Sequence, residues 1–200
     1  MRRFVSAALV FFLVFLGWLA SPDKSYAEGN QNAVNIGAAT VIIGSVVYVE
    51  YERAINEKIS LAGRVGALSY DVDYDEDGGT TNETGDGTGV VASVRFYPTH
   101  DLQGNNFEGF YLGGGVGVWS VDWEWEWTHS TFATETGSGS STALDLNFNL
   151  GWKIPLGSDR VYIDPNIALG NLFISTESKS GDSDEVGLYA AAGLAVGITF

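Results

Sequence analysis

The sequence contains no cysteine, and its 10 lysine and arginine residues are outnumbered by 25 aspartates and glutamates. Without cysteine, the chain cannot form disulfides, thiolate metal sites or a cysteine nucleophile. The net charge of −15 argues against a nucleic-acid partner, because phosphate binding requires a basic surface. Charged residues make up only 18% of the chain and hydrophobic residues 45%, which excludes a disordered protein.

Helical periodicity is also missing, and the residues that are abundant favour strands. The chain has 26 glycines, 13% aromatic residues and only 4 prolines. Glycine is among the poorest helix formers, so this composition predicts tight strands rather than helices.

Only one long hydrophobic run is present, and it lies at the start of the chain. Arg2 and Arg3 precede the apolar segment Phe4–Ala20, and Ser25-Tyr26-Ala27 follows as a small-x-small cleavage site. This order predicts a secretory signal peptide over residues 1–27, with 28–200 as the exported domain. An uncleaved membrane anchor is the alternative, and the absence of cysteine excludes lipoprotein attachment.

The remainder shows repeated alternation of apolar and polar or small residues, the period of a strand with two different faces. The last segment is the clearest, with Val186, Leu188 and Leu194 on one face and Gly187 and Tyr189 on the other. Eight segments of this kind are expected, at 33–43, 45–55, 58–70, 88–98, 107–123, 141–154, 160–175 and 186–200.

The segments between these strands alternate in length. Asp71–Gly87, Thr128–Ser140 and Thr176–Glu185 are long and polar, whereas those at 56–57, 98–106 and 155–159 are shorter. In a meander, this alternation places long loops at one end and short turns at the other, as in outer-membrane barrels. The fold class predicted is therefore all-β: an eight-stranded antiparallel up-and-down transmembrane β-barrel. A soluble ligand-binding barrel is the alternative, but the second face carries glycine and alanine rather than long polar side chains.

The chain resembles the small outer-membrane β-barrels of Gram-negative bacteria, of the OmpA transmembrane-domain and OmpX type. The signal peptide, the eight alternating strands, the loop asymmetry and the terminal Phe200 carry this resemblance. It implies a monomer in the cell outer membrane, in contact with membrane lipid and lipopolysaccharide. It also implies that the barrel-assembly machinery reads the last strand through Phe200. It implies little about activity.

Charged residues on the polar face of the strands point into the lumen of such a barrel. We expect Glu50, Glu52, Arg64 and Arg95 to form a buried charge network that closes the lumen. An ion path along these residues is the alternative. A wide diffusion pore is excluded, because eight strands leave room only for side chains.

The sequence predicts no catalytic residues and no cofactor. His129 is adjacent to Ser130 and close to Glu135, which leaves open an enzyme acting on lipopolysaccharide lipid. Neighbouring residues on an extended chain point to opposite faces, so His129 and Ser130 would not meet. The other histidine, His100, falls in a predicted periplasmic turn.

An acidic segment, Asp73, Asp75 and Asp77 followed by Gly78, resembles the start of a calcium-binding loop. The twelfth loop position is Thr84 rather than an acid, and no flanking helices are predicted, so these are weak metal candidates. A solvated acidic loop is the alternative.

A row of tryptophans, Trp119, Trp123, Trp125 and Trp127, is predicted to form an aromatic girdle at one membrane interface. Phe110 and Tyr111 are expected at the opposite interface. The alternative is an adhesive aromatic strip raised above the membrane. The apolar parity changes near Trp119, which predicts either a bulge or an extension beyond the membrane. Together these features predict a non-enzymatic outer-membrane protein with a structural, surface-interaction or adhesive role.

Overall fold

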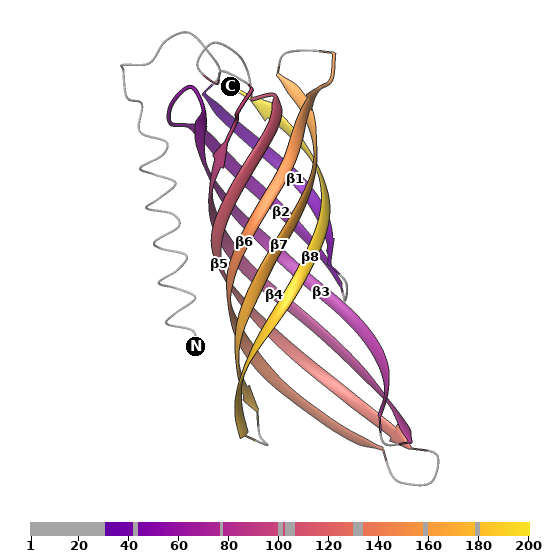
Figure 1. Ribbon diagram of the computed structural model, residues 1–200. Helices are drawn as coiled ribbons and strands as arrows, with labels where there is room; N and C mark the ends of the chain where they lie inside the picture. The colour runs from indigo at the N-terminus through magenta and orange to yellow at the C-terminus, as the bar shows by residue number, and fades with distance from the viewer. Residues whose placement is uncertain are drawn as a thin grey trace.

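The computed structural model describes residues 31–41, 44–76, 78–99, 102, 107–129, 134–157, 160–178 and 181–200. The predicted signal peptide, His100, Asp77 and Ser130 lie outside these ranges. The described chain forms a closed barrel in which each strand pairs antiparallel with its sequence neighbours and the last pairs with the first (Figure 1). The strands are β1 (Asn32–Val41), β2 (Gly44–Ala54), β3 (Ile59–Glu76), β4 (Gly79–Phe96), β5 (Gly109–His129), β6 (Glu135–Pro155), β7 (Val161–Ser178) and β8 (Gly181–Thr199).

This architecture confirms the predicted eight-stranded antiparallel up-and-down barrel. Successive strand partners traced from Val41 through β2 to β7 reach β8 at Gly181, whereas Val41 itself pairs with Ala191. The stagger around the barrel is therefore ten residues. With about 3.3 Å per residue and about 4.8 Å between strands, this stagger gives a strand tilt of about 40°.

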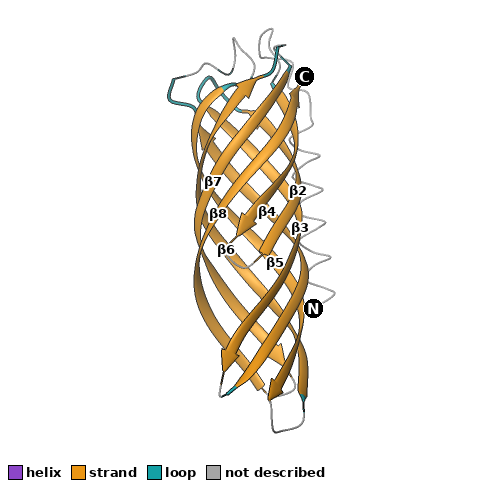
Figure 2. Ribbon diagram, turned by 90° about the vertical axis from the view of Figure 1, so that its right-hand side faces the viewer, coloured by secondary structure: helices purple, strands orange, loops and turns teal. Residues whose placement is uncertain are grey.

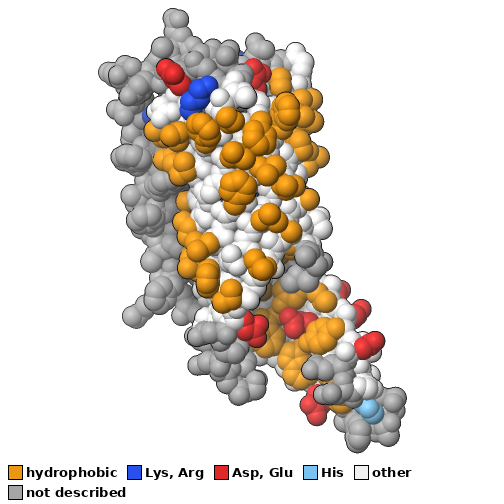
Figure 3. Space-filling model, in the orientation of Figure 1, with side chains coloured by type: hydrophobic (Ala, Val, Ile, Leu, Met, Phe, Trp, Pro, Cys, Tyr) orange, Lys and Arg blue, Asp and Glu red, His pale blue; other side chains and the backbone are white. Residues whose placement is uncertain are grey.

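The outer face of the barrel carries a belt of apolar side chains, and those on the face turned to the viewer are orange in Figure 3. Large side chains on it are solvent-accessible to an extent unusual for a water-soluble surface, Leu169 at 57% and Leu194 at 55% for example. Other members are Val47, Val49, Val94, Phe96, Val116, Leu146, Phe148, Trp152, Ile167, Val196 and Ile198. Among the described residues there is no helix with the length and apolarity to cross a membrane.

The inner face owes its close packing to glycine. A Cβ added at Gly37 would lie 2.6 Å from the ring of Tyr48, and one at Gly197 would lie 2.4 Å from the ring of Tyr162. Both pairs join neighbouring strands, so the aromatic rings lie flat over the glycine backbone. The high glycine content thus lets large rings fit inside a narrow barrel.

The strands are longer than the sequence predicts at the end opposite the chain termini. β3 continues to Glu76, and β4 begins at Gly79, so most of the segment predicted as the loop Asp71–Gly87 is a strand hairpin. The predicted loops Thr128–Ser140 and Thr176–Glu185 are likewise largely strand. The loop prediction was wrong because it relied on composition, whereas each segment is held by ladder hydrogen bonds to its neighbours.

The long and short connections also lie at different ends from those predicted. The longest, between Phe96 of β4 and Gly109 of β5, lies at the end with the chain termini, where the loops gather in Figure 2. The predicted break at residue 44, between the segments 33–43 and 45–55, is also displaced, because β1 ends at Val41 and Gly44 already belongs to β2. The end opposite the termini is therefore distinguished by strands that extend past the predicted loop boundaries, and not by longer loops.

Candidate functional site

The lumen near the chain termini holds a dense network of charges. Both carboxylates, Glu50 and Glu52, project from β2 and are almost completely buried. Arg95 of β4 bridges them, with Nη2 donating to Glu50 Oε2 at 2.8 Å and Nη1 donating to Glu52. Arg64 of β3 donates from Nη2 to Glu50 Oε2 at 2.9 Å. The structure thus brings all four residues of the sequence-predicted lumen network together.

Further residues, which alternation along the sequence does not single out, complete this network. Lys153 of β6 contacts Glu52 and is fully buried, and Asp164 of β7 accepts hydrogen bonds from the Tyr111 hydroxyl at 3.1 Å. Tyr97 donates to Glu52 at 2.7 Å, and Asn35 donates to Glu50 at 2.9 Å. Three carboxylates therefore face three cations, counting Arg64, so the network is neutral when all six are ionised.

Aromatic rings cover the cations of the network. The Arg64 guanidinium lies 3.8 Å from the Tyr48 ring centroid, and that of Arg95 lies 4.6 Å from Tyr111. Tyr111 was expected at a membrane interface, and this expectation was wrong. Its side chain points inward, because on β5 it shares the face of Gly113, which pairs with Arg95.

The connection from β4 to β5 closes this end of the barrel. Leu102 and Phe107 are buried, and with Tyr97, Tyr111, Tyr162 and Ala33 they form one apolar cluster beneath the network. The backbone amide of Leu102 donates to the carbonyl of Glu57 at 2.8 Å, which ties this connection to the turn between β2 and β3. The sequence signal was two apolar residues, Leu102 and Phe107, in an otherwise polar turn.

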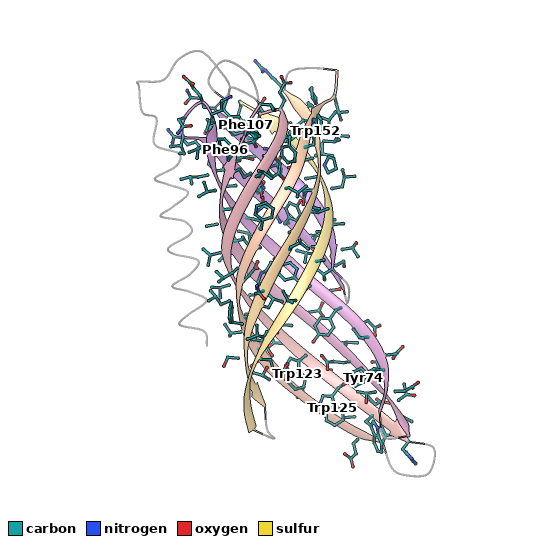
Figure 4. All side chains as sticks on the ribbon, in the orientation of Figure 1. Tyr74, Phe96, Phe107, Trp123, Trp125 and Trp152 are labelled. Carbon is teal, nitrogen blue, oxygen red and sulfur yellow. The ribbon has the colours of Figure 1, made fainter. Side chains whose placement is uncertain are left out.

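At the end opposite the chain termini, which is the lower end in Figure 1, β3 to β6 continue past β1 and β2. There they form a four-stranded sheet that projects beyond the apolar belt, called the raised sheet below. Trp123 pairs with Gly85 and Gly139, and Trp125 pairs with Glu83 and Gly137, all on the face that continues the lumen. Trp119 and Trp127 share this parity. The predicted outward-facing aromatic girdle was therefore wrong, although Phe110 does face outward. Figure 4 places Trp123, Trp125 and Tyr74 on the raised sheet.

No bulge accounts for the change of parity in β5. Val118 pairs with Val90, and Trp119 pairs with Gly89, in unbroken register. The extension beyond the apolar belt is the explanation that the structure supports. Beyond Val118 the outward residues become polar, as at Asp122 and Glu124, while the inward ones become aromatic.

The acidic candidates for a metal site lie on the outer face of this sheet. Asp73 and Asp75 belong to β3 rather than to a loop, and Asn82 donates to both Asp71 at 2.9 Å and Asp73 at 3.0 Å. Thr80 donates to Asp75 at 3.1 Å. Across the described residues no group of three or more potential ligands converges as a metal site would require.

The inner face of the raised sheet carries fewer polar side chains than its outer face. The hydroxyl of Tyr70 donates to Glu83 Oε1 at 2.8 Å, and burial together with this carboxylate raises the pKa of Tyr70. His129 ends β5 and stacks on Trp127, with ring centroids 5.5 Å apart. Its parity places it on the same inner face as that tryptophan, so it belongs to the aromatic row.

Comparison with known proteins identifies the fold. No family model and no curated protein matches the sequence. Ail, the attachment invasion locus protein of Yersinia pestis, has a similar structure at 15% identity, over 86% of this chain and 100% of Ail, with a TM-score of 0.52. The chain has the fold of the small outer-membrane β-barrels. A major outer membrane protein of Thermus thermophilus is similar over 84% of this chain and 99% of its own, at 14% identity and a TM-score of 0.50. The fold thus agrees with the resemblance to OmpA and OmpX.

Proposed function

We propose that this protein is a non-enzymatic, integral outer-membrane barrel that displays the raised sheet of β3 to β6 at the cell surface for surface interactions. The observation that carries the proposal is the change along each strand from an apolar outer belt to a polar, acidic outer face. On β5 the outward residues run from Val116 and Val118 to Asp122, Glu124 and Glu126. An outer surface of this kind suits lipid at one height and water above it.

The apolar belt also decides between the membrane barrel and the soluble ligand-binding barrel. A soluble barrel would expose this belt to water, where a contiguous apolar surface of this extent leads to association. In the outer membrane, contact with lipid and lipopolysaccharide would remove the same apolar surface from water. Recognition of the last strand by the barrel-assembly machinery is part of this proposal, with Phe200 exposed at 54% beside the belt.

A structural or surface role fits the lumen better than transport. Arg95, Glu52 and Lys153 meet across it, and Phe107 and Leu102 pack beneath them. An enzyme acting on lipid is the second candidate that the sequence raised. His129 faces inward onto Trp127, away from the outer face that lipid would contact, which argues against that role.

Orientation can be tested with single cysteines, because the chain has none of its own. Thr80 is exposed at the tip of the raised sheet, and Glu57 is exposed in a turn at the opposite end. On intact cells, an impermeant maleimide should label a Thr80→Cys variant and leave Glu57→Cys unlabelled until the outer membrane is permeabilised. Labelling of Glu57→Cys alone would invert the orientation, and recovery of the protein in the soluble fraction would refute the membrane assignment.

A further inference from the structure

The inner face of the raised sheet presents five aromatic side chains where the barrel no longer surrounds them. We define this inner aromatic face as Tyr70, Tyr74, Trp123, Trp125 and Trp127. β2 pairs with β3 only as far as Tyr70, and β7 pairs with β6 only from Gly139, whereas β4 and β5 remain paired as far as Gly79 and His129. The face therefore continues past the points where β2 and β7 are joined to the sheet, and Tyr74 is 43% exposed. Orange side chains beside red ones mark the raised sheet in Figure 3.

Glycines opposite the rings hold them flat against the sheet. A Cβ at Gly137 would lie 2.4 Å from the Trp125 indole, and one at Gly139 would lie 2.4 Å from the Trp123 indole. A Cβ at Gly79 would lie 2.7 Å from Trp127 Nε1. Because no side chain stands between ring and backbone, the indoles of Trp123 and Trp125 each present one face, which carries negative charge density, away from the sheet. The Trp127 indole also contacts the His129 ring, with centroids 5.5 Å apart.

Carboxylates accompany these rings on the same face. Glu83 pairs directly with Trp125, and Glu135 pairs directly with Trp127. Directly paired side chains in a sheet have Cβ atoms about 4.5–5.5 Å apart, so a cation on either indole lies within reach of a carboxylate. Residues 65–94 and 96–152, which include the whole raised sheet, contain no lysine or arginine.

The spacing of the indoles along β5 is that of alternate residues. Trp123, Trp125 and Trp127 are two residues apart, which corresponds to about 6.8 Å between neighbouring rings. The side chains on one face of an extended peptide repeat at the same distance. A peptide with a cation at every second position therefore matches this row of rings in both spacing and charge.

We propose that the inner aromatic face binds a cationic peptide segment in extended conformation, with arginine or lysine at alternate positions stacked on Trp123, Trp125 and Trp127. Glu83 and Glu135 pair with the bound cations, and the acidic outer face attracts the segment from solution. This inference rests on the proposed function, because it requires the raised sheet to be accessible from outside the cell.

Charge favours this occupant over the others that a flat aromatic face admits. A neutral sugar would stack on the rings but would gain nothing from Glu83 and Glu135. A second copy of the chain would bring its own acidic sheet against this one, and like charges would repel. An arginine guanidinium uses both features, since it stacks on indoles and pairs with carboxylates.

The test is binding of a synthetic peptide to the purified full-length barrel in a maltoside detergent. Detergents with choline headgroups are avoided, because their quaternary ammonium groups would compete for the rings. The probe is an eight-residue Arg-Ser repeat, and its matched control has the same composition with four consecutive arginines. Binding is followed by calorimetry and by the indole N–H signals, with outward-facing Trp152 as the internal reference.

We expect the alternating peptide to shift the signals of Trp123, Trp125 and Trp127 but not that of Trp152. Trp125→Leu should weaken binding about fivefold, and Trp125→Phe should weaken it by no more than about twofold. Glu83→Gln should weaken binding about fivefold, whereas Glu124→Gln, the same charge change on the outer face, should have less than about a twofold effect. Folding of each variant is checked by heat-dependent gel mobility, and the two isosteric glutamine variants decide the matter if Trp125→Leu does not fold.

Three results would overturn the inference: equal losses for Glu83→Gln and Glu124→Gln, equal binding of the two peptides, or indole shifts with a neutral oligosaccharide and not with the peptide. The first would reduce the effect to general electrostatics. Because binding is measured in detergent, it does not depend on orientation in the cell. Surface labelling of Thr80→Cys without peptide binding would refute this inference alone, and binding without labelling would refute the proposed display at the surface.

Discussion

Replacing Arg95 with alanine should destabilise the folded barrel by about 3–5 kcal/mol, because it leaves buried carboxylates short of one cation. Arg95 is 1% exposed and contacts both Glu50 and Glu52. Each hydrogen bond of this kind contributes about 1.5–3 kcal/mol. Arg64 and Lys153 remain to compensate in part, so the loss should fall below the sum of the broken bonds.

The measurement is a urea unfolding titration of protein refolded into lipid vesicles, followed by tryptophan fluorescence. Arg160→Ala is the control, because Arg160 is exposed in a turn, and it should change the unfolding free energy by less than about 0.5 kcal/mol. An Arg95→Ala variant within about 1 kcal/mol of wild type would refute the buried network. Unchanged single-channel conductance in the same variant would also argue against an ion path through Arg95.

Further substitutions test the outer face, the lumen packing and assembly. Leu194→Arg should cost about 2–4 kcal/mol in the same titration, because Leu194 lies in the middle of the apolar belt, and equal stability would refute the face assignment. Gly37→Ala should cost about 1–3 kcal/mol because its Cβ would press on the Tyr48 ring, whereas Gly187→Ala, with nothing within 4 Å, should stay within about 0.5 kcal/mol. Phe200→Ser should lower the amount of protein in the outer membrane yet refold normally in vitro, and loss of refolding would indicate a structural role instead.

The barrel was predictable because strand periodicity is a local signal. The alternation at Val186 to Phe200 assigned residues 186–199 of β8 to the faces on which the structure places them. The extended ends of the strands were not predictable in this way. Segments 71–76 and 79–87 are rich in aspartate, glycine and threonine, which favour turns, and their strand conformation depends on partners in β4 and β5.

The sequence predicted that charged residues form a network in the lumen, but it did not predict all of the residues that take part. Glu50, Glu52, Arg64 and Arg95 are charges at lumen positions of consecutive strands; Glu50 pairs directly with Arg64, and Arg95 reaches both carboxylates across β3. Lys153 lies 101 residues from Glu52 and meets it across the barrel. Which residues meet across a lumen depends on the stagger of the strands, and alternation alone does not specify the stagger.

The tryptophan row shows why hydrophobicity by itself misassigns a face. In β5 the outward residue changes from Val118 to Ser120, and in β6 it changes from Leu144 to Thr142. Val118 pairs with Leu144, and Ser120 pairs with Thr142, so two strands place the upper limit of the apolar belt at the same height. Above that limit an aromatic residue has no lipid to contact, and the inner face is the side of the sheet that excludes more water. Each tryptophan therefore lies on the face of the sheet that is less exposed to water. Within the belt this is the outer, lipid-facing side, and beyond the belt it is the inner side.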